Sequence, residues 1–125
     1  VAACRLPGTD LVIPPTPPPD IDVEVWEDSI ALVEGWGPEK LALTHFGPVD
    51  DPVPHLAEAR RRLREEAELA KQMDEAAYEA DLQSRIAATL DDPEATQEMF
   101  QAVPTAYQWS GLDRYWRKRA EREAG

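Results

Sequence analysis

The stretch from residue 55 to residue 92 contains neither glycine nor proline, whereas ten of the twelve prolines lie before it. Apolar residues recur in this stretch at every third or fourth position, which is the spacing of one face of a helix. A single helix of that length would be unusual, so we expect two helices with a break near residues 73–78. The recurring positions are Leu56, Ala59, Leu63, Ala67 and Ala70, followed by Leu82, Ile86 and Leu90.

The chain is predicted to change character near residue 51. Residues 1–50 are expected to form a part that contains strands, and residues 51–125 a helical appendage. Within the appendage, Asp92 can cap a third helix that has Pro93 at its first position, and Pro104 ends that helix.

The last helix is predicted from Gly111 to about Glu121, because Ser110 and Asp113 resemble a capping box. This end of the chain also has an unusual density of aromatic residues. We interpret them as packing residues, either within the chain or against another one, rather than as a ligand box. They are Tyr107, Trp109, Tyr115 and Trp116.

The first part has the element order strand, turn, strand, helix, strand, which is typical of an α/β fold. Asp20 or Asp22 can cap the helix, and glycines at 35 and 37 can end it. The expected elements are strands at 1–6, 11–13 and 41–44, a turn at 7–10, and a helix with Trp26, Ile30 and Val33 on one face.

Residues 14–19 are five prolines and one threonine, so the segment has few backbone donors and is expected to run extended, close to polyproline II. Such a segment can bind an SH3-like groove. Because it lies between two apolar elements in a short chain, a stiff surface connection is the favoured interpretation.

The charge of the chain constrains its partners. There are 25 acidic residues against 13 basic ones, a formal net charge of −12. This balance argues against nucleic-acid binding, which needs a positive surface to displace counterions, and against docking on anionic lipid. No apolar run approaches the roughly 18 residues of a membrane span. We therefore expect neither nucleic acid nor a membrane as a partner.

The single cysteine, Cys4, cannot form an internal disulfide, which fits a reducing compartment and predicts a cytoplasmic location. Cys4 occupies a strand position and is expected to be a small buried apolar group.

His45 is the residue most suggestive of chemistry. It follows the apolar run at residues 41–43 and precedes a glycine, so its ring is well placed to project into a site at the end of a strand. Imidazole is a common zinc ligand. The alternative interpretation is a histidine satisfied by local hydrogen bonds.

Four short segments resemble the metallo-β-lactamase superfamily of hydrolases. Residues 41–48 (Leu-Ala-Leu-Thr-His-Phe-Gly-Pro) resemble its last zinc-ligand region. Residues 5–8 (Arg-Leu-Pro-Gly) and 14–18 (Pro-Pro-Thr-Pro-Pro) resemble the preceding part of one hydrolase-like branch. Residues 111–118 (Gly-Leu-Asp-Arg-Tyr-Trp-Arg-Lys) resemble the helical tail of that branch.

The resemblance implies an αββα sandwich with one or two zinc ions at one edge of the paired sheets. It makes His45 the final histidine ligand and the only ligand that can be assigned in this chain. The His-x-His-x-Asp-His cluster of that family does not occur in the sequence. Since the chain also begins within a predicted strand, we expect the C-terminal fragment of a longer parent, itself inactive.

The other candidate residues have structural interpretations. His55, at a predicted helix start, is expected to be solvated. Asp50 and Asp51 precede a helix and are expected to be caps. The basic runs at 60–62 and 117–119 are interleaved with or followed by glutamates, so they are expected to be solvated faces with i,i+4 pairs.

The sequence thus predicts the C-terminal part of a zinc-dependent hydrolase acting on a small ester, thioester, amide or phosphoester. A second hypothesis is an acidic helical interaction module without catalysis, in which residues 54–122 bind a partner. The apolar stripes and the aromatic end also predict a homodimer through residues 54–122. The sequence does not specify the substrate or the metal.

Overall fold

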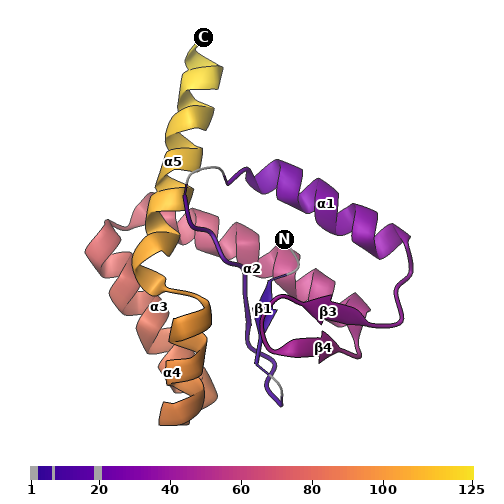
Figure 1. Ribbon diagram of the computed structural model, residues 1–125. Helices are drawn as coiled ribbons and strands as arrows, with labels where there is room; N and C mark the ends of the chain where they lie inside the picture. The colour runs from indigo at the N-terminus through magenta and orange to yellow at the C-terminus, as the bar shows by residue number, and fades with distance from the viewer. Residues whose placement is uncertain (1–2, 7, 19–20) are drawn as a thin grey trace.

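The computed structural model describes residues 3–6, 8–18 and 21–125. The expected positions at residues 1 and 2 of the first strand, Pro7 of the turn, Pro19 and the alternative cap Asp20 lie outside the described residues. In chain order the elements are β1 (Cys4–Arg5), β2 (Val12–Ile13), α1 (Val23–Gly35), β3 (Leu41–Leu43), β4 (Gly47–Val49), α2 (Pro52–Gln72), α3 (Glu75–Leu90), α4 (Pro93–Ala102) and α5 (Thr105–Ala124) (Figure 1).

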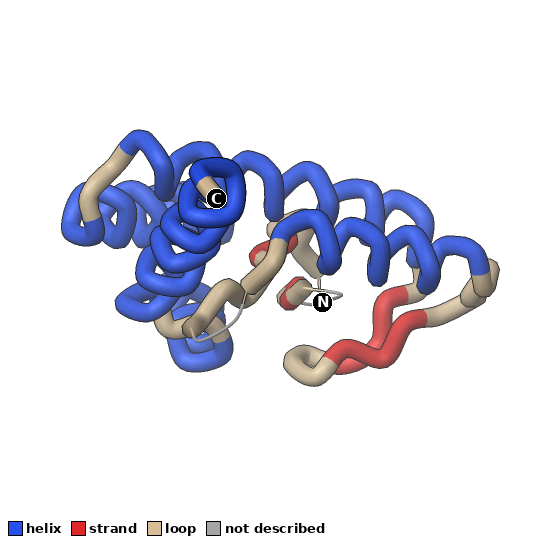
Figure 2. The backbone as a smooth tube through the Cα atoms, turned by 90° about the horizontal axis from the view of Figure 1, so that it is seen from above, coloured by secondary structure: helices blue, strands red, loops and turns tan. Residues whose placement is uncertain are grey.

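The strands form two separate antiparallel pairs. β1 pairs with β2, with Cys4 opposite Ile13, and β3 pairs with β4, with Leu41 opposite Val49. Figure 2 shows the β3–β4 hairpin set apart from the β1–β2 pair. The prediction of a helix-rich chain that contains strands is confirmed. Within the part of the chain that the structure describes, β3 pairs with β4 and not with β1 or β2. The αββα sandwich therefore stays a prediction about the longer parent protein.

Helix α1 begins where the sequence predicted. The Asp22 carboxylate accepts a hydrogen bond from the Val25 backbone N–H at 3.2 Å, as an N-cap does. α1 lies antiparallel to α2, because Glu27 pairs with Arg64 and Glu34 pairs with Arg60 further back along α2. Ile30, on the inner face of α1, is buried.

The predicted break in the long helical stretch occurs at residues 73–74. Asp74 caps α3 by accepting from the Ala77 N–H at 2.9 Å. Behind this corner, the buried Glu66 carboxylate accepts from the Tyr78 hydroxyl at 2.6 Å and from both terminal nitrogens of Arg85 at 2.7 and 3.1 Å. Burial, together with the adjacent Glu66, raises the pKa of Tyr78, so its hydroxyl stays a donor to this carboxylate.

Helix α4 has Asp92 as its cap and Pro93 at its first position, as predicted. The predicted start of the last helix at Gly111 is wrong, since α5 begins at Thr105. Ser110 lies inside the helix, where its hydroxyl donates to the Tyr107 carbonyl at 3.0 Å instead of capping an N-terminus.

The proline-rich segment packs against α5, so the prediction of a surface connection is wrong for its central residue. Thr16 is buried, and its N–H donates to the Gln108 side-chain oxygen at 2.7 Å. The Thr16 hydroxyl donates to the Gln108 carbonyl at 3.0 Å, and the Gln108 amide donates back to the Pro14 carbonyl at 2.9 Å. Gly111 permits this approach, because a Cβ there would lie 2.0 Å from the backbone carbonyl oxygen of Thr16.

The aromatic end of the chain is a packing element, as expected. The Trp116 indole N–H donates to the Ala67 carbonyl at 2.7 Å, and that of Trp109 donates to the Met73 carbonyl at 2.9 Å. These bonds fix both indole rings against the C-terminal end of α2, and the Met73 carbonyl lies just beyond its last residue. The partners therefore lie within the chain, although Tyr107 is exposed.

The main hydrophobic core takes residues from both parts of the chain. Leu6, Leu11 and Ile13 pack with residues of the later helices, including Leu63 and Leu82, which are 0 % and 1 % exposed. The apolar stripes that motivated a dimer through residues 54–122 are thus covered within the chain. The homodimer stays a prediction, and so does the division of the chain into a strand-containing part at 1–50 and a helical appendage at 51–125.

The helical surface outside this core carries the expected ion pairs. Arg61 lies 3.1 Å from Glu65, and Arg117 lies 2.8 Å from Asp113. Among the described residues, no helix has both the length and the apolar composition needed to cross a bilayer.

Candidate functional site

The β3–β4 hairpin places His45 in its turn. The side chain of His45 is exposed, as expected for a residue that projects from the end of β3. The backbone reverses at Phe46 and Gly47, which have φ values of +68° and +82°. Glycine adopts this region freely, but it is unfavourable for a bulky side chain such as that of Phe46. Phe46 is therefore held in a backbone conformation that its own side chain disfavours, and strained residues of this kind are frequent at functional sites.

Phe46 supplies the anchor that holds this turn. Its ring is half-buried and packs against the main core, and the ring centroids of His45 and Phe46 are 6.4 Å apart. Leu41, at the other end of the hairpin, packs against the second, smaller core cluster. The role of Phe46 was not predicted from the sequence, although a large apolar residue between His45 and Gly47 is a signal that could have identified it.

Ion pairs lie at the base of the hairpin. Lys40 lies 3.5 Å from Asp50, just outside the two strands. Asp51 occupies the N-cap position of α2, but its side chain makes no capping hydrogen bond and instead accepts from the Arg5 guanidinium at 2.8 Å. Arg5 also donates to the Thr9 carbonyl at 2.9 Å. The prediction that Asp51 caps α2 through its side chain is therefore wrong, and the residue joins the hairpin to β1.

The described residues do not supply a complete metal site at the hairpin. Among them, no group of three or more His, Cys, Asp and Glu side chains lies close enough together to hold a metal ion. A catalytic zinc usually has three protein ligands. His45 alone therefore does not fit a complete zinc site, and any metal bound there would need ligands from outside the described residues.

The structure corrects the prediction for His55 and confirms that for Cys4. His55 is 1 % exposed rather than solvated, because the first turn of α2 packs inward. Cys4 is 2 % exposed, and burial raises the pKa of its thiol, which keeps it protonated and unreactive.

His55 lines a cavity of about 350 Å³ at the junction of β1, β2 and α2. Arg5 neutralises part of its acidic wall, because the guanidinium lies 2.8 Å from Asp51 and 3.6 Å from Asp10. We interpret this arrangement as an ion-pair cluster that ties three segments together. The lining residues are Arg5, Asp10, Val12, Asp51, Pro54, His55 and Glu58.

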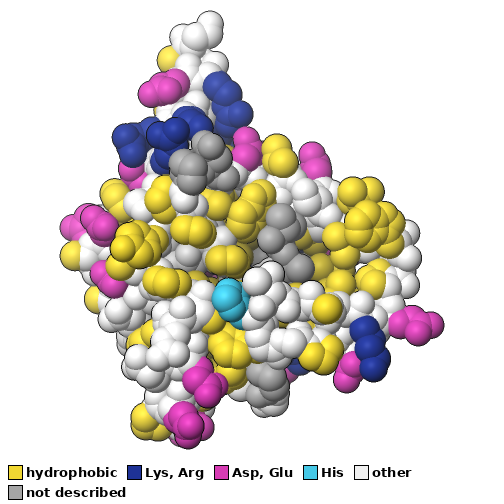
Figure 3. Space-filling model, viewed as in Figure 1, with side chains coloured by type: hydrophobic (Ala, Val, Ile, Leu, Met, Phe, Trp, Pro, Cys, Tyr) yellow, Lys and Arg dark blue, Asp and Glu magenta, His cyan; other side chains and the backbone are white. Residues whose placement is uncertain are grey.

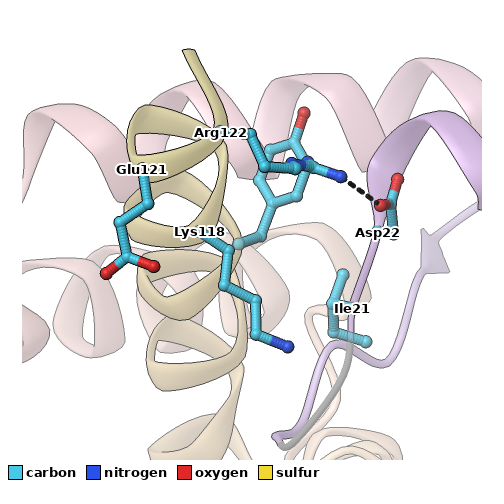
Figure 4. A pocket seen from close by; sticks show the side chains of 6 residues that line it. Ile21, Asp22, Lys118, Glu121 and Arg122 are labelled. Atoms are coloured by element: carbon cyan, nitrogen blue, oxygen red, sulfur yellow. Dashed lines mark ion pairs between the residues drawn. The ribbon is translucent and has the colours of Figure 1, made fainter. Parts of the chain in front are cut away.

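A second cavity, of about 490 Å³, lies between the start of α1 and α5 (Figure 4). Arg122 lies 3.5 Å from Asp22 across its upper rim, and the Tyr115 hydroxyl donates to Glu24 at 2.8 Å nearby. Figure 4 shows Glu121 directed away from Ile21 and Asp22. These contacts hold α5 to α1, and they do not assemble a nucleophile with a base. The lining residues are Ile21, Asp22, Tyr115, Lys118, Glu121 and Arg122.

No protein-family model, curated protein or solved structure matches this chain.

Proposed function

We propose that this chain is the C-terminal part of a zinc-dependent hydrolase in which His45 is one of the zinc ligands. The observation that carries the proposal is the anchored hairpin, which presents an exposed imidazole at a backbone turn held by Phe46. The resemblance of residues 41–48 to the last zinc-ligand region of metallo-β-lactamase hydrolases supports the same assignment.

When bound, a zinc ion would supply Lewis-acid activation of water for hydrolysis near neutral pH. The role of this chain is to hold one imidazole in position. The packing of Phe46 against the core holds the backbone of the turn from which His45 projects. The remaining ligands, including a His-x-His-x-Asp-His cluster, would come from the rest of the parent.

The substrate class that goes with this proposal is a small ester, thioester, amide or phosphoester. The two antiparallel strand pairs would belong to the edge of an αββα sandwich completed by the rest of the parent. A cytoplasmic location and a homodimer remain further parts of the proposal.

Zinc analysis of the intact parent tests the assignment. The comparison is between the unmodified protein, His45→Ala, and Thr44→Ala as a control at the neighbouring exposed residue. We expect His45→Ala to lower the zinc content of the protein and to reduce turnover at least about tenfold, while Thr44→Ala changes neither. A His45→Ala protein with unchanged zinc content and turnover would show that His45 is not a ligand.

A further inference from the structure

Helix α1 carries three large apolar side chains on its outer surface. Val25 is 56 % exposed, Leu32 is 59 % exposed and Trp36, at the C-cap, is 70 % exposed. Figure 3 shows hydrophobic side chains gathered over the right-hand end of α1. An apolar surface of this kind on a charged protein commonly marks an interaction site.

The three side chains form one stripe. At about 100° per residue, positions 25, 32 and 36 fall within roughly 40° of each other on the helix. The buried Ile30 lies roughly 140° away from Val25 on the same wheel, so the stripe faces away from the core. Val25 and Trp36 are eleven positions apart, which corresponds to a length of about 16 Å along a helix. The stripe therefore matches about three turns of a partner helix.

The charges of α1 argue against a second copy of this chain as the occupant of the stripe. Two copies packed stripe to stripe would bring together two acidic helices that contain no basic residue, and like charges oppose association.

The charges around the stripe indicate the chemistry of the partner. Helix α1 contains Glu24, Glu27, Asp28 and Glu34 and no basic residue. Glu27 and Glu34 are paired with arginines of α2, on the inner side. Asp28 is exposed and makes no ion pair with any residue in the part of the chain that the structure describes. It lies three residues after Val25 and four before Leu32, so its carboxylate borders the stripe.

We infer that the stripe Val25–Leu32–Trp36 is a docking surface for a basic amphipathic helix of another protein. The apolar face of that helix would cover Leu32 and Trp36, and a lysine or arginine beside that face would pair with Asp28. Tryptophan is the residue type that most often dominates such contacts, so Trp36 is the expected anchor. This docking surface is independent of zinc and of His45.

The test uses the intact protein and a labelled 15-residue peptide with leucine at every third or fourth position and lysine elsewhere. A second peptide has glutamate in place of every lysine. Binding is measured by fluorescence anisotropy for the unmodified protein, Leu32→Ser, Trp36→Ser and Asp28→Lys. Tyr107→Ser is the matched control, because Tyr107 is 60 % exposed on α5 and is not part of the stripe. Circular dichroism checks that each exposed-site variant is folded.

We expect the lysine peptide to bind, Leu32→Ser and Trp36→Ser to weaken it about tenfold or more, and Tyr107→Ser to leave it unchanged. Asp28→Lys should weaken binding most at low salt. The inference is overturned if the stripe variants bind as tightly as the unmodified protein, or if the glutamate peptide binds equally well. It is also overturned if sedimentation shows a dimer that Leu32→Ser converts to a monomer, since a second copy would then occupy the stripe.

Discussion

Replacement of Gly111 by alanine tests how α5 is joined to the proline-rich segment. A Cβ at this position would lie 2.0 Å from the carbonyl oxygen of Thr16 and 2.9 Å from its carbonyl carbon. Real Cβ contacts are almost never shorter than 3.0 Å, so the backbone of the segment has to move away by about 1 Å. Both hydrogen bonds that Thr16 donates to Gln108, at 2.7 and 3.0 Å, depend on that approach.

The magnitude follows from three contributions. Overpacking of a close contact costs about 1–3 kcal/mol, and the loss of two buried hydrogen bonds costs about 1–3 kcal/mol. Alanine is better than glycine in a helix by about 1 kcal/mol, which offsets part of this cost. We therefore expect Gly111→Ala to lower the free energy of unfolding by about 3 kcal/mol.

Urea unfolding measures this change, and Gly35→Ala is the matched control. Gly35 is the last residue of α1, and no atom lies within 4 Å of the position that a Cβ would occupy there. The same substitution at Gly35 should be neutral or stabilise the protein by up to about 1 kcal/mol. If Gly111→Ala were as stable as the unmodified protein or Gly35→Ala, the packing of Thr16 against α5 would be refuted.

Three other predictions concern the isolated chain. It should show no zinc-dependent hydrolysis of generic esters above its own His45→Ala variant, since one imidazole does not hold a catalytic zinc; activity above that control would contradict this. Phe46→Ala should destabilise the chain by about 1–2 kcal/mol in urea unfolding through lost packing, and no change would show that Phe46 is not an anchor. Arg85→Ala should cost about 2–3 kcal/mol, because it leaves the buried Glu66 with only the Tyr78 hydroxyl; Glu66→Gln should cost less, and the reverse order would contradict the proposed network.

The helix boundaries that the sequence predicts well are those with a local chemical cause. Asp22 and Asp92 cap their helices, and the chain breaks at residues 73–74 where the apolar spacing changes. These features depend on neighbours along the chain, so local patterns are sufficient to locate them.

The features that the sequence does not predict depend on distant contacts. Gly111 has the pattern of a helix boundary, yet it lies within α5, where the absence of a side chain lets the Thr16 backbone approach. Strand β4 contains Pro48, which weakens any strand signal, and it forms because β3 pairs with it. His55 is buried by the tertiary packing of the first turn of α2, which its place at a helix start does not reveal.

The candidate site is predicted from sequence only in part. His45 lies at the end of β3 as expected, but its place in a tight hairpin turn and the anchoring by Phe46 follow from tertiary packing. The other ligands of the proposed zinc site cannot be assigned to the described residues by either route.

The most direct test of the central proposal is anomalous X-ray scattering at the zinc edge from crystals of the intact parent. The proposal predicts an anomalous peak about 2.0–2.1 Å from one imidazole nitrogen of His45, with the other ligands supplied by the rest of the parent. A zinc peak whose ligands do not include His45, or crystals grown with zinc that show no peak near the β3–β4 hairpin, would contradict it.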